Sequence, residues 1–459
     1  MNIAEEIFKK ADPFSVAVIE MGVTHSYGAL NQWSEEIAGR LREEHRVTPS
    51  ARIGLQCADG LNYIALALGV LRVGACFVPI APELSKSEAE TLASTLCLSG
   101  LLVGEKAAGL FSYSSTDLPL LPPWQDAFIS MNPALIRFSS GTTGASKGIL
   151  LSHETLRDRI IAANEGLCIG PDDRVLWVLS MAHHFAVSIM LYLWNGASIV
   201  FPDSHHAADI LAAAAAHGAT VFYGSPFHYV LLSAERWPHV WPTLRLAVST
   251  TAQLPATVGS DFAAASGVYP SQALGLMEVG LPFLNQPKPS KRPQSIGRPQ
   301  PAFEAMLLGE DGAAAKQGNP GELFLKGPGM FDAYIEPWKK RRDILQEGVW
   351  FATGDIARMD VEGFYYLQGR TKPVINVGGM KFFPEEVEEL LCSHPGVADA
   401  RVKSISHPTF GSIPVAEVVA SEISKPTIVE LNIFCRKQLA RYKVPAQILF
   451  VDSIARTST

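Results

Sequence analysis

Hydrophobic positions along the chain follow two alternating spacings. Short apolar runs typical of buried strands, such as residues 16–19 and 53–56, are separated by stretches of helical periodicity at 27–41 and 62–73. Strands that alternate with helices of this length predict parallel α/β layers. A second series of the same kind runs from residue 207 to 284. The pattern therefore predicts an α/β protein with two α/β-layered subdomains.

The pattern changes twice in the last third of the chain. Prolines and lysines gather between residues 286 and 301, and short apolar runs with glycine turns then predict a β subdomain. Beyond Gly369-Arg370 the chain returns to a small βαβ-like pattern with helical periodicity at 384–391 and 427–440. We therefore expect an N-terminal domain over residues 1–369 and a small, mobile α+β C-terminal domain over 370–459.

Residues 175–202 carry no Asp, Glu, Lys or Arg, which raises the question of a membrane span. Polar residues interrupt this stretch, among them His183, His184, Ser188 and Asn195. A spanning helix needs about 20 consecutive apolar residues. The stretch is better interpreted as a strand, a helix and a second strand inside a core.

Composition narrows the class of protein. The chain has 459 residues, 47% of them hydrophobic, and a net charge of −7, and it contains no long basic run, so nucleic acid is not an expected partner. Its six cysteines lack CxxC spacing, which argues against a zinc site and a disulfide framework. The N-terminal residues mix charges and lack the apolar core of a signal peptide. We expect a cytoplasmic protein without a membrane partner.

One loop has the composition of a phosphate-binding site. Residues 138–148 read Phe-Ser-Ser-Gly-Thr-Thr-Gly-Ala-Ser-Lys-Gly and lead into an apolar run. Glycines allow several backbone N–H groups to approach one anion, and the hydroxyls and Lys147 add donors and charge. The Walker pattern does not fit, because Ser146 precedes Lys147 and Gly148 follows it. The alternative is an ordinary polar turn between strands.

Four further stretches stand in a fixed order with this loop: 274–278 (Leu-Gly-Leu-Met-Glu), 353–355 (Thr-Gly-Asp), 369–372 (Gly-Arg-Thr-Lys), and 378–381 (Gly-Gly-Met-Lys) before a Pro-Glu-Glu-Val-Glu run. Together with the loop, they resemble the adenylate-forming superfamily of acyl-CoA synthetases, luciferases and adenylation domains. The resemblance covers essentially the whole chain. It implies an ATP- and Mg²⁺-dependent ligase that converts a carboxylic acid into an acyl-adenylate and transfers the acyl group to a thiol of CoA or of a carrier-protein phosphopantetheine.

The resemblance also implies roles for individual residues. Lys147 and Glu278 would take part in catalysis, Glu278 as a Mg²⁺ ligand, with a solvated carboxylate as the alternative for Glu278. Lys372 would be the hinge between the domains, and an ordinary surface lysine is the equal alternative. Asp355 would hold the ribose hydroxyls and Arg370 the ribose and phosphate; a salt bridge between domains is the structural alternative for both. The residues assigned to ATP are Ser139, Ser140, Gly141, Thr142, Thr143, Gly144, Lys147, Thr251, Ala252, Leu274, Gly275, Met277, Asp355 and Arg370.

The segment around His183 and His184 resembles the acid pocket of the family, and His184 is a further catalytic candidate. Two histidines in an uncharged run are otherwise most often a hydrogen-bonded core pair. Amino-acid-activating members generally place an aspartate in this segment, and none is present here. A buried substrate ammonium would then be costly, so we expect an aryl or other non-amino acid. The expected pocket residues are His183, His184, Phe185, Ser188, Gly224, Ser225, Ser249, Thr250, Gly275 and Gly280.

Several positions depart from the family pattern. Leu274 and Met277 replace a common aromatic ring and a common threonine, and Thr250 and Thr251 replace customary glycines; Pro373 stiffens the expected hinge. Residues 450–459 resemble the run that leads, in the family, into a Gly-Lys pair whose lysine assists adenylation, and the given sequence does not contain that lysine. We expect slower adenylation by this polypeptide than by an extended one, and equal single-turnover rates would contradict that expectation. The alternatives are a fatty-acid ligase of the same fold and a catalytically degraded adenylate-binding protein.

Overall fold

The computed structural model describes residues 1–116, 122–139, 147–235, 241–309, 311–371, 374–421 and 425–454, with backbone alone at Ser139, Lys147 and Val187. The chain forms two compact units. Unit 1 comprises Met1–Pro82, Leu96–Phe138 and Gly148–Gly369. Unit 2 includes Glu83–Thr95 and Arg370–Thr459.

The first sheet of unit 1, sheet A, has nine strands among the described residues, in the order β15-β14-β13-β12-β11-β9-β10-β1-β2. The neighbours from β13 to β1 are parallel, and antiparallel strands lie at both edges. The strands are β1 (Val16–Glu20), β2 (Val23–Ser26), β9 (Arg174–Trp177), β10 (Ser198–Val200), β11 (Val221–Gly224), β12 (Leu246–Ser249), β13 (Ser271–Leu276), β14 (Gly280–Leu284) and β15 (Arg298–Pro299).

The second sheet, sheet B, has eight strands within the described part of the chain, in the order β19-β18-β8-β7-β4-β3-β5-β6. Its central pairs β3-β4, β3-β5 and β4-β7 are parallel. The strands are β3 (Arg52–Gln56), β4 (Cys76–Pro79), β5 (Gly100–Gly104), β6 (Phe111–Ser115), β7 (Pro133–Ser139), β8 (Lys147–Ser152), β18 (Ala333–Tyr334) and β19 (Lys339–Lys340).

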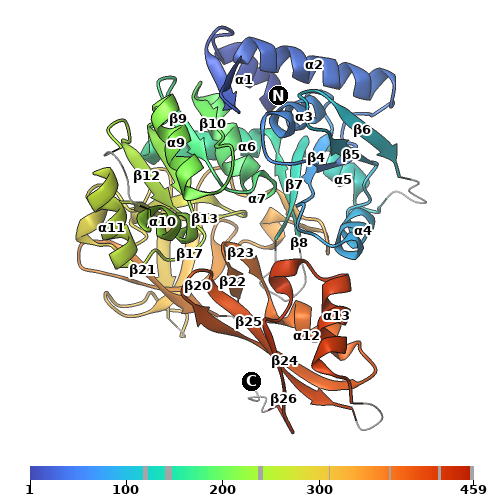
Figure 1. Cartoon of the computed structure of the whole chain (residues 1–459), viewed down its shortest axis with the longest axis vertical. Helices are drawn as coiled ribbons and strands as arrows, with labels where there is room; N and C mark the ends of the chain where they lie inside the picture. The colour runs from blue at the N-terminus through green and yellow to red at the C-terminus, as the bar shows by residue number, and fades with distance from the viewer. Residues whose placement is uncertain are drawn as a thin grey trace. The chain divides into compact units, whose positions relative to one another are not determined.

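Helices cover the sheets of unit 1 and supply its cores. Helix α3 is buried from Leu61 to Leu71 in the main core, while α9, α10 and α11 cover sheet A around Phe222, Tyr229 and Phe262. Figure 1 shows these three helices beside β9 to β13 in green and yellow. The helices are α1 (Ile3–Lys10), α2 (Tyr27–Glu43), α3 (Leu61–Arg72), α5 (Gln125–Ile129), α6 (His153–Leu167), α7 (Met181–His184), α8 (Met190–Trp194), α9 (Ala207–His217), α10 (Pro226–Ser233) and α11 (Ala256–Ser266).

A further sheet with four strands in the described part of the chain follows, in the order β16-β17-β20-β21, and β17 is antiparallel to both β16 and β20. Its strands are β16 (Glu304–Leu308), β17 (Gly321–Lys326), β20 (Phe351–Met359) and β21 (Tyr365–Arg370). This is the β subdomain that the glycine turns predicted. Short helical turns lie between β14 and β15, at η2 (Pro289–Lys291), and between β19 and β20, at η3 (Arg341–Asp343).

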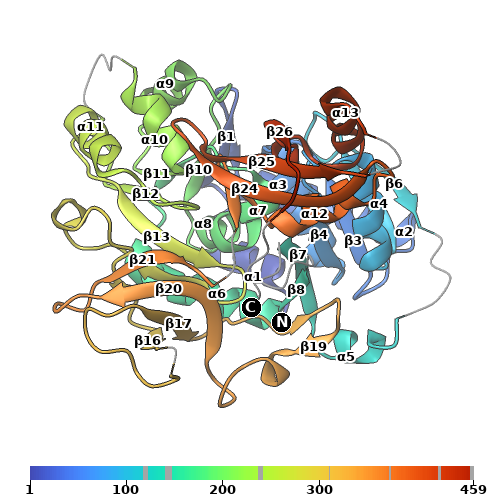
Figure 2. The same cartoon turned by 90° about the horizontal axis from the view of Figure 1, so that it is seen from below.

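Unit 2 is built on a sheet that has five strands among its described residues, with the order β23-β22-β25-β24, and β26 pairs in parallel with β25. Helices α12 and α13 pack on this sheet around Val387, Leu431 and Ile448 (Figure 2). Strand β25, helix α13 and strand β26 form a βαβ unit, since β25 and β26 pair in parallel. The pairs β22-β23 and β24-β25 are antiparallel hairpins. The elements are β22 (Ile375–Val377), β23 (Met380–Phe382), α12 (Pro384–Cys392), β24 (Val397–His407), β25 (Gly411–Ala420), α13 (Ile428–Gln438), η4 (Arg441–Lys443) and β26 (Gln447–Phe450).

Helix α4 (Lys86–Thr95) belongs to unit 2 although its neighbours in sequence belong to unit 1. Lys443 explains this grouping: its Nζ donates to Glu88 of α4 at 2.7 Å and to Glu386 of α12 at 3.0 Å. All three side chains are largely buried. A buried ion pair with two carboxylates on one ammonium is costly to break, so it holds α4 to α12 and η4.

The uncharged stretch 175–202 forms β9, a broken helix and β10, as the sequence analysis predicted. The helix consists of α7, a π-helical turn, η1 (Phe185–Ile189), and α8. Among the described residues, no helix is both long and apolar enough to cross a bilayer.

Candidate active site

The predicted phosphate loop connects β7 and β8 of sheet B. Both strands are described, and Ile149 to Leu151 of β8 are buried in the core, so the two ends of the loop are anchored in the sheet. The side chains of the predicted loop residues and of the predicted hinge lie outside the described part of the structure, so their roles stay predictions. The residues concerned are Ser139, Ser140, Gly141, Thr142, Thr143, Gly144, Lys147, Lys372 and Pro373.

Glu278 lies in the tight turn that reverses the chain from β13 into β14. Gly280 closes the turn with φ 109°, a conformation that favours glycine, and a Cβ there would lie 3.2 Å from Arg159 Cγ. The Tyr334 hydroxyl donates to Glu278 Oε1 at 3.2 Å, and the Phe331 N–H donates to the Glu278 carbonyl at 2.8 Å. Two contacts from one segment therefore fix both the backbone and the carboxylate of Glu278.

A buried cation stands near this carboxylate. Arg159 of α6 is fully buried, and its guanidinium donates to the Gly329 carbonyl at 2.7 and 3.0 Å. Burial lowers the pKa of Arg159 to about 10, and Asp332 and Glu278 act in the opposite direction. Burial also raises the pKa of Tyr334, with a further contribution from Glu278, so the phenol keeps the proton that it donates.

The half-buried Glu278 carboxylate is a hard oxygen donor, and Mg²⁺ is commonly held by one or two carboxylates together with phosphate oxygens. No cluster of three or more His, Cys, Asp or Glu side chains in the described part of the chain could hold a metal ion by itself. The residues present therefore fit a Mg²⁺ ion that shares its ligands with a nucleotide, and they do not form an all-protein metal cage.

The other residues assigned to the nucleotide lie in or next to strands of unit 1 and at the end of β21. Met277 is buried, Leu274 is half-buried and Gly275 is exposed. Asp355 is buried in β20, where its N–H donates to Thr353 Oγ1 at 3.0 Å while that hydroxyl donates to the Leu323 carbonyl. Thr353 thus orders the backbone that carries Asp355. Arg370 ends β21 and belongs to unit 2.

The predicted acid pocket gathers at the carboxyl edge of sheet A. Trp177, Gly224 and Ser249 end the adjacent parallel strands β9, β11 and β12, with Gly224 directly opposite Ser249 in the ladder. The Thr250 N–H donates to the Gly224 carbonyl at 3.1 Å. Ligands of open α/β sheets bind at such an edge. The structure thus brings Gly224, Ser249 and Thr250 together.

His183 and His184 lie on α7, immediately before the π-helical turn that contains Ser188. Such turns occur frequently at functional sites. The guanidinium Nη2 of Arg137, at the end of β7, lies 3.3 Å from His183 Nδ1. Burial, together with a smaller contribution from the Arg137 charge, lowers the pKa of His183 to about 3. His183 is therefore neutral at physiological pH. Since arginine only donates, its Nδ1 accepts and its Nε2 carries the proton.

Aromatic rings form a wall beside the histidines. His184 contacts Trp177 edge to face with ring centroids 5.9 Å apart, and Trp177 stacks on Tyr223 at 5.9 Å. Burial raises the pKa of Tyr223 to about 12, partly offset by hydrogen bonds with Thr250 and Ser188. The wall therefore combines flat apolar surfaces with hydroxyl groups from two other predicted pocket residues.

Ser225 does not face the pocket as a free hydroxyl. Its Oγ lies 2.8 Å from His228 Nδ1, and its N–H donates to the same nitrogen at 3.3 Å, which caps α10. Burial lowers the pKa of His228 to about 4. This pairing gives Ser225 a structural role at the start of the helix.

Thr251 has φ 75°, which is unusual for a β-branched residue. The sequence analysis identified Thr250 and Thr251 as replacements of customary glycines. A positive φ at Thr251 explains why glycine suits this position, and it implies local strain of about 1–3 kcal/mol in this chain. Such strain is typical of binding sites.

Sequence reasoning missed Arg137, Arg159 and Tyr334. Arg137 had a usable signal, because it is a lone charge in the otherwise apolar run that precedes the phosphate loop. Arg159 and Tyr334 had none, since an arginine in an amphipathic helix and a tyrosine in a short strand are ordinary, and only the fold brings them to Glu278.

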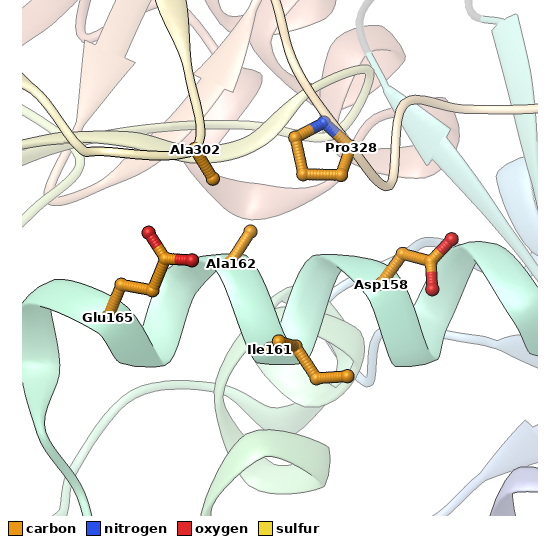
Figure 3. A pocket seen from close by; sticks show the side chains of 6 residues that line it. All are labelled: Asp158, Ile161, Ala162, Glu165, Ala302 and Pro328. Atoms are coloured by element: carbon orange, nitrogen blue, oxygen red, sulfur yellow. The ribbon is translucent and has the colours of Figure 1, made fainter.

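A surface hollow of about 140 Å³ lies elsewhere on unit 1, between α6 and the loops at Ala302 and Pro328 (Figure 3). Asp158 and Glu165 stand at its two ends and Ile161 and Ala162 between them. None of the predicted site residues lines it, so it is separate from the candidate active site.

Comparison with known proteins identifies the family. The model of the AMP-binding enzyme family matches residues 7–335, and that of the AMP-binding enzyme C-terminal domain matches residues 386–459. The chain belongs to the AMP-binding enzyme family, the adenylate-forming superfamily that the five motifs indicated.

Its relatives are acid–CoA ligases. A sulfoacetate–CoA ligase of Cupriavidus necator is 32% identical over 342 residues, which cover 74% of this chain and 66% of that protein. A feruloyl-CoA synthase of an Amycolatopsis species is 26% identical over 98% of this chain and 94% of its own length. Among solved structures, an o-succinylbenzoate CoA synthetase of Bacillus subtilis superposes with a TM-score of 0.88 at 22% identity, over 100% of this chain and 96% of the other.

These matches confirm the predicted fold class and the predicted enzyme class. The fold is a mixed α/β architecture with a large N-terminal and a small C-terminal domain. The enzyme class is that of acid–thiol ligases, whose members use ATP, Mg²⁺ and CoA.

Proposed function

We propose that this protein activates a carboxylic acid in two steps. A carboxylate oxygen attacks the α-phosphorus of ATP, the bond to the β-phosphate bridging oxygen breaks, and pyrophosphate leaves. A thiolate of CoA then attacks the acyl carbon, and AMP leaves with the electrons of the acyl–oxygen bond. The thiol proton passes to solvent, so the products are an acyl thioester, AMP and pyrophosphate.

Each predicted site residue would have its own role in this reaction. Mg²⁺ bound at Glu278 would offset the charge of the phosphates, while Tyr334 holds the carboxylate in place. The Ser139–Lys147 loop would bind the departing pyrophosphate with backbone N–H groups and the Lys147 ammonium. Asp355 would accept hydrogen bonds from the ribose hydroxyls, and Arg370 would bind ribose and phosphate. Lys372 would serve as the hinge.

The choice of acid rests mainly on Arg137. Its guanidinium Nη2 lies 3.3 Å from Nδ1 of His183 in the predicted acid pocket. A substrate ammonium at this place would face a permanent cation. The acid is therefore not an α-amino acid. Trp177 and Tyr223 are buried and stacked on each other beside the predicted pocket, and this aromatic environment favours an aryl acid. A fatty acid is the alternative, and a carrier-protein phosphopantetheine is the alternative thiol.

The test is a product analysis. The protein is incubated with ATP, Mg²⁺, CoA and single members of a panel of aryl, short-chain, long-chain and amino acids, and AMP and acyl-CoA are quantified. Formation of both products in equal amounts with a non-amino acid supports the proposal. Binding of ATP without AMP formation across the panel would support the degraded adenylate-binding protein instead, and AMP formation only with amino acids would contradict the assignment.

A further inference from the structure

Arg159 of α6 connects two segments that meet at Glu278. Its side chain is fully buried, and Nε and Nη2 both donate to the Gly329 carbonyl, at 3.0 and 2.7 Å. A Cβ at Gly329 would lie 2.5 Å from the backbone nitrogen of Arg159, so the loop of residues 327–332, here called the Gly329 loop, rests directly on α6. The same arginine packs against Gly280, two residues after Glu278. One side chain thus joins α6, the Gly329 loop and the turn that carries Glu278.

The Gly329 loop and the strand that follows it contact Glu278 twice. The Phe331 N–H donates to the Glu278 carbonyl at 2.8 Å. The Tyr334 hydroxyl donates to Glu278 Oε1 at 3.2 Å. Gly329 has φ 68°, a conformation that favours glycine and turns the chain toward these contacts. A shift of the loop at Gly329 therefore displaces the groups that orient both the backbone and the carboxylate of Glu278.

The hydrogen bonds of Arg159 go to the loop rather than to a carboxylate. Among the described residues, its third nitrogen, Nη1, has no hydrogen-bond partner. Asp332 and Glu278 both favour the charged form of the guanidinium, while burial lowers its pKa to about 10, so it is charged at neutral pH. Because two carboxylates balance this one charge, the net field that they leave at a bound nucleotide is small. Arg159 therefore acts on Glu278 mainly through the loop.

The metal makes this contact important. Mg²⁺ demands near-ideal geometry of its oxygen ligands, and groups behind a ligand fix its orientation. Resting on the proposed function, we infer that Arg159 is a positioning residue: by holding the Gly329 loop on α6, it places the Glu278 carboxylate for the Mg²⁺ ion that binds with the nucleotide. This role requires an effect on nucleotide binding that depends on Mg²⁺. Attraction between the guanidinium and the phosphates would act at least as strongly without the metal.

The experiment measures the binding of α,β-methylene-ATP, which cannot release pyrophosphate, by calorimetry with Mg²⁺ and again with EDTA. The wild type is compared with Arg159→Met, which has no donor, and with Arg159→Lys, which keeps the charge and one donor group. We expect Arg159→Met to weaken binding at least fivefold with Mg²⁺ and less than twofold with EDTA. Arg159→Lys should recover part of the Mg²⁺-dependent loss. A loss that is equally large under both conditions would overturn the inference.

Arg52 provides a matched control for a purely structural role. It is also buried, and its Nε donates to the Cys97 carbonyl at 2.9 Å, but it lies in β3 of sheet B. Arg52→Met and Arg159→Met should both lower the free energy of unfolding in urea. Only Arg159→Met should reduce the gain in nucleotide affinity that Mg²⁺ provides. If the two variants bind the analogue alike, Arg159 only stabilises the fold.

Glu278→Gln separates this inference from the proposed function. If Glu278→Gln loses the gain from Mg²⁺ and Arg159→Met keeps it, the metal site stands and the inference is wrong. If Glu278→Gln keeps the gain, or the wild type does not bind the analogue, both are contradicted. In the double variant, Arg159→Met should add less than twofold to the loss caused by Glu278→Gln, and a full additional loss contradicts the inference. If Arg159→Met does not fold, Arg159→Gln replaces it under the same criteria.

Discussion

The hydroxyl of Tyr334 donates a 3.2 Å hydrogen bond to Oε1 of Glu278, and the segment that carries Tyr334 also binds the backbone of Glu278 through Phe331. The proposed Mg²⁺ ligand is thus held from two sides. A carboxylate oriented in this way loses little freedom when it binds a metal ion.

Glu278→Gln should abolish most Mg²⁺-dependent activity. The amide keeps the size of the side chain and can still accept from Tyr334, but it removes the charge that faces the cation. We expect kcat/KM in thioester formation to fall on the order of 100-fold or more, as for other lost electrostatic contacts at charged transition states. Initial rates at several Mg²⁺ concentrations measure the effect. Unchanged Mg²⁺ dependence would show that Glu278 is not the ligand.

Tyr334→Phe should have a smaller effect at the same place. One hydrogen bond to a carboxylate is worth about 1.5–3 kcal/mol, and part of it remains when other groups or water replace the phenol. We therefore expect a rise of about fivefold in the Mg²⁺ concentration for half-maximal rate, with a near-normal rate at saturation. Tyr366, which bonds Asp360 at 2.9 Å, provides the matched control: Tyr366→Phe should leave the Mg²⁺ dependence unchanged.

Asp355→Asn should weaken nucleotide binding through the ribose. An ionised acceptor contributes about 1.5–3 kcal/mol per hydrogen bond, so KM for ATP should rise on the order of 10-fold or more. With 2′,3′-dideoxy-ATP as substrate, wild type and variant should differ much less. A penalty that is equally large with both nucleotides would assign Asp355 a structural role instead.

Thr251→Gly should stabilise the chain. Relief of the φ 75° strain, about 1–3 kcal/mol, exceeds the entropic cost of glycine of about 0.5–1 kcal/mol. We expect the free energy of unfolding to rise by about 1 kcal/mol in urea. Thr250 is the matched control, because it is buried and is not among the residues with positive φ. Thr250→Gly should destabilise, and equal effects of the two substitutions would argue against strain at Thr251.

Acid should destabilise unit 1 through its buried histidines. Burial lowers the pKa of His153 and of His228 to about 4 and that of His183 to about 3, while the unfolded chain protonates near 6.5. The unfolded state therefore binds more protons below pH 6.5. Stability is fully present above that pH and falls as the pH drops toward 4, by up to about 1.4 kcal/mol per pH unit for each histidine.

Urea unfolding at pH 7 and pH 5 tests this dependence. His153→Asn, whose Oδ1 can still accept from the Ile3 N–H that now binds Nδ1, should make the decrease clearly smaller. His206→Asn at an exposed position should not change it. A decrease that is the same in all three proteins would assign the acid sensitivity to other groups.

Much of the fold could be predicted from local patterns. The helices predicted at 27–41, 62–73 and 384–391 are observed within two residues as α2, α3 and α12, since each combines a buried face with a clear start or stop. The small βαβ-like unit expected after Gly369-Arg370 is formed by β25, α13 and β26, although the sequence pattern did not indicate which strands pair. Strand β25 pairs with β22 and β26, which are distant from it in the sequence, and the periodicity of one segment does not indicate its partner.

The candidate site was predictable only where a motif marks it. Glu278, His183 and Asp355 belong to motifs, whereas Tyr334 and Arg159 reach Glu278 through tertiary packing alone. The strain at Thr251 could not be read from composition, because it is a property of the backbone where the chain leaves β12.

Acid-dependent exchange of labelled pyrophosphate into ATP, without CoA, measures the central claim most directly, because only reversible formation of an acyl-adenylate produces it. We predict exchange that requires both Mg²⁺ and a non-amino carboxylic acid and that falls by about 100-fold or more in Glu278→Gln. Exchange that proceeds without an acid, or that Glu278→Gln leaves unchanged, would contradict the account.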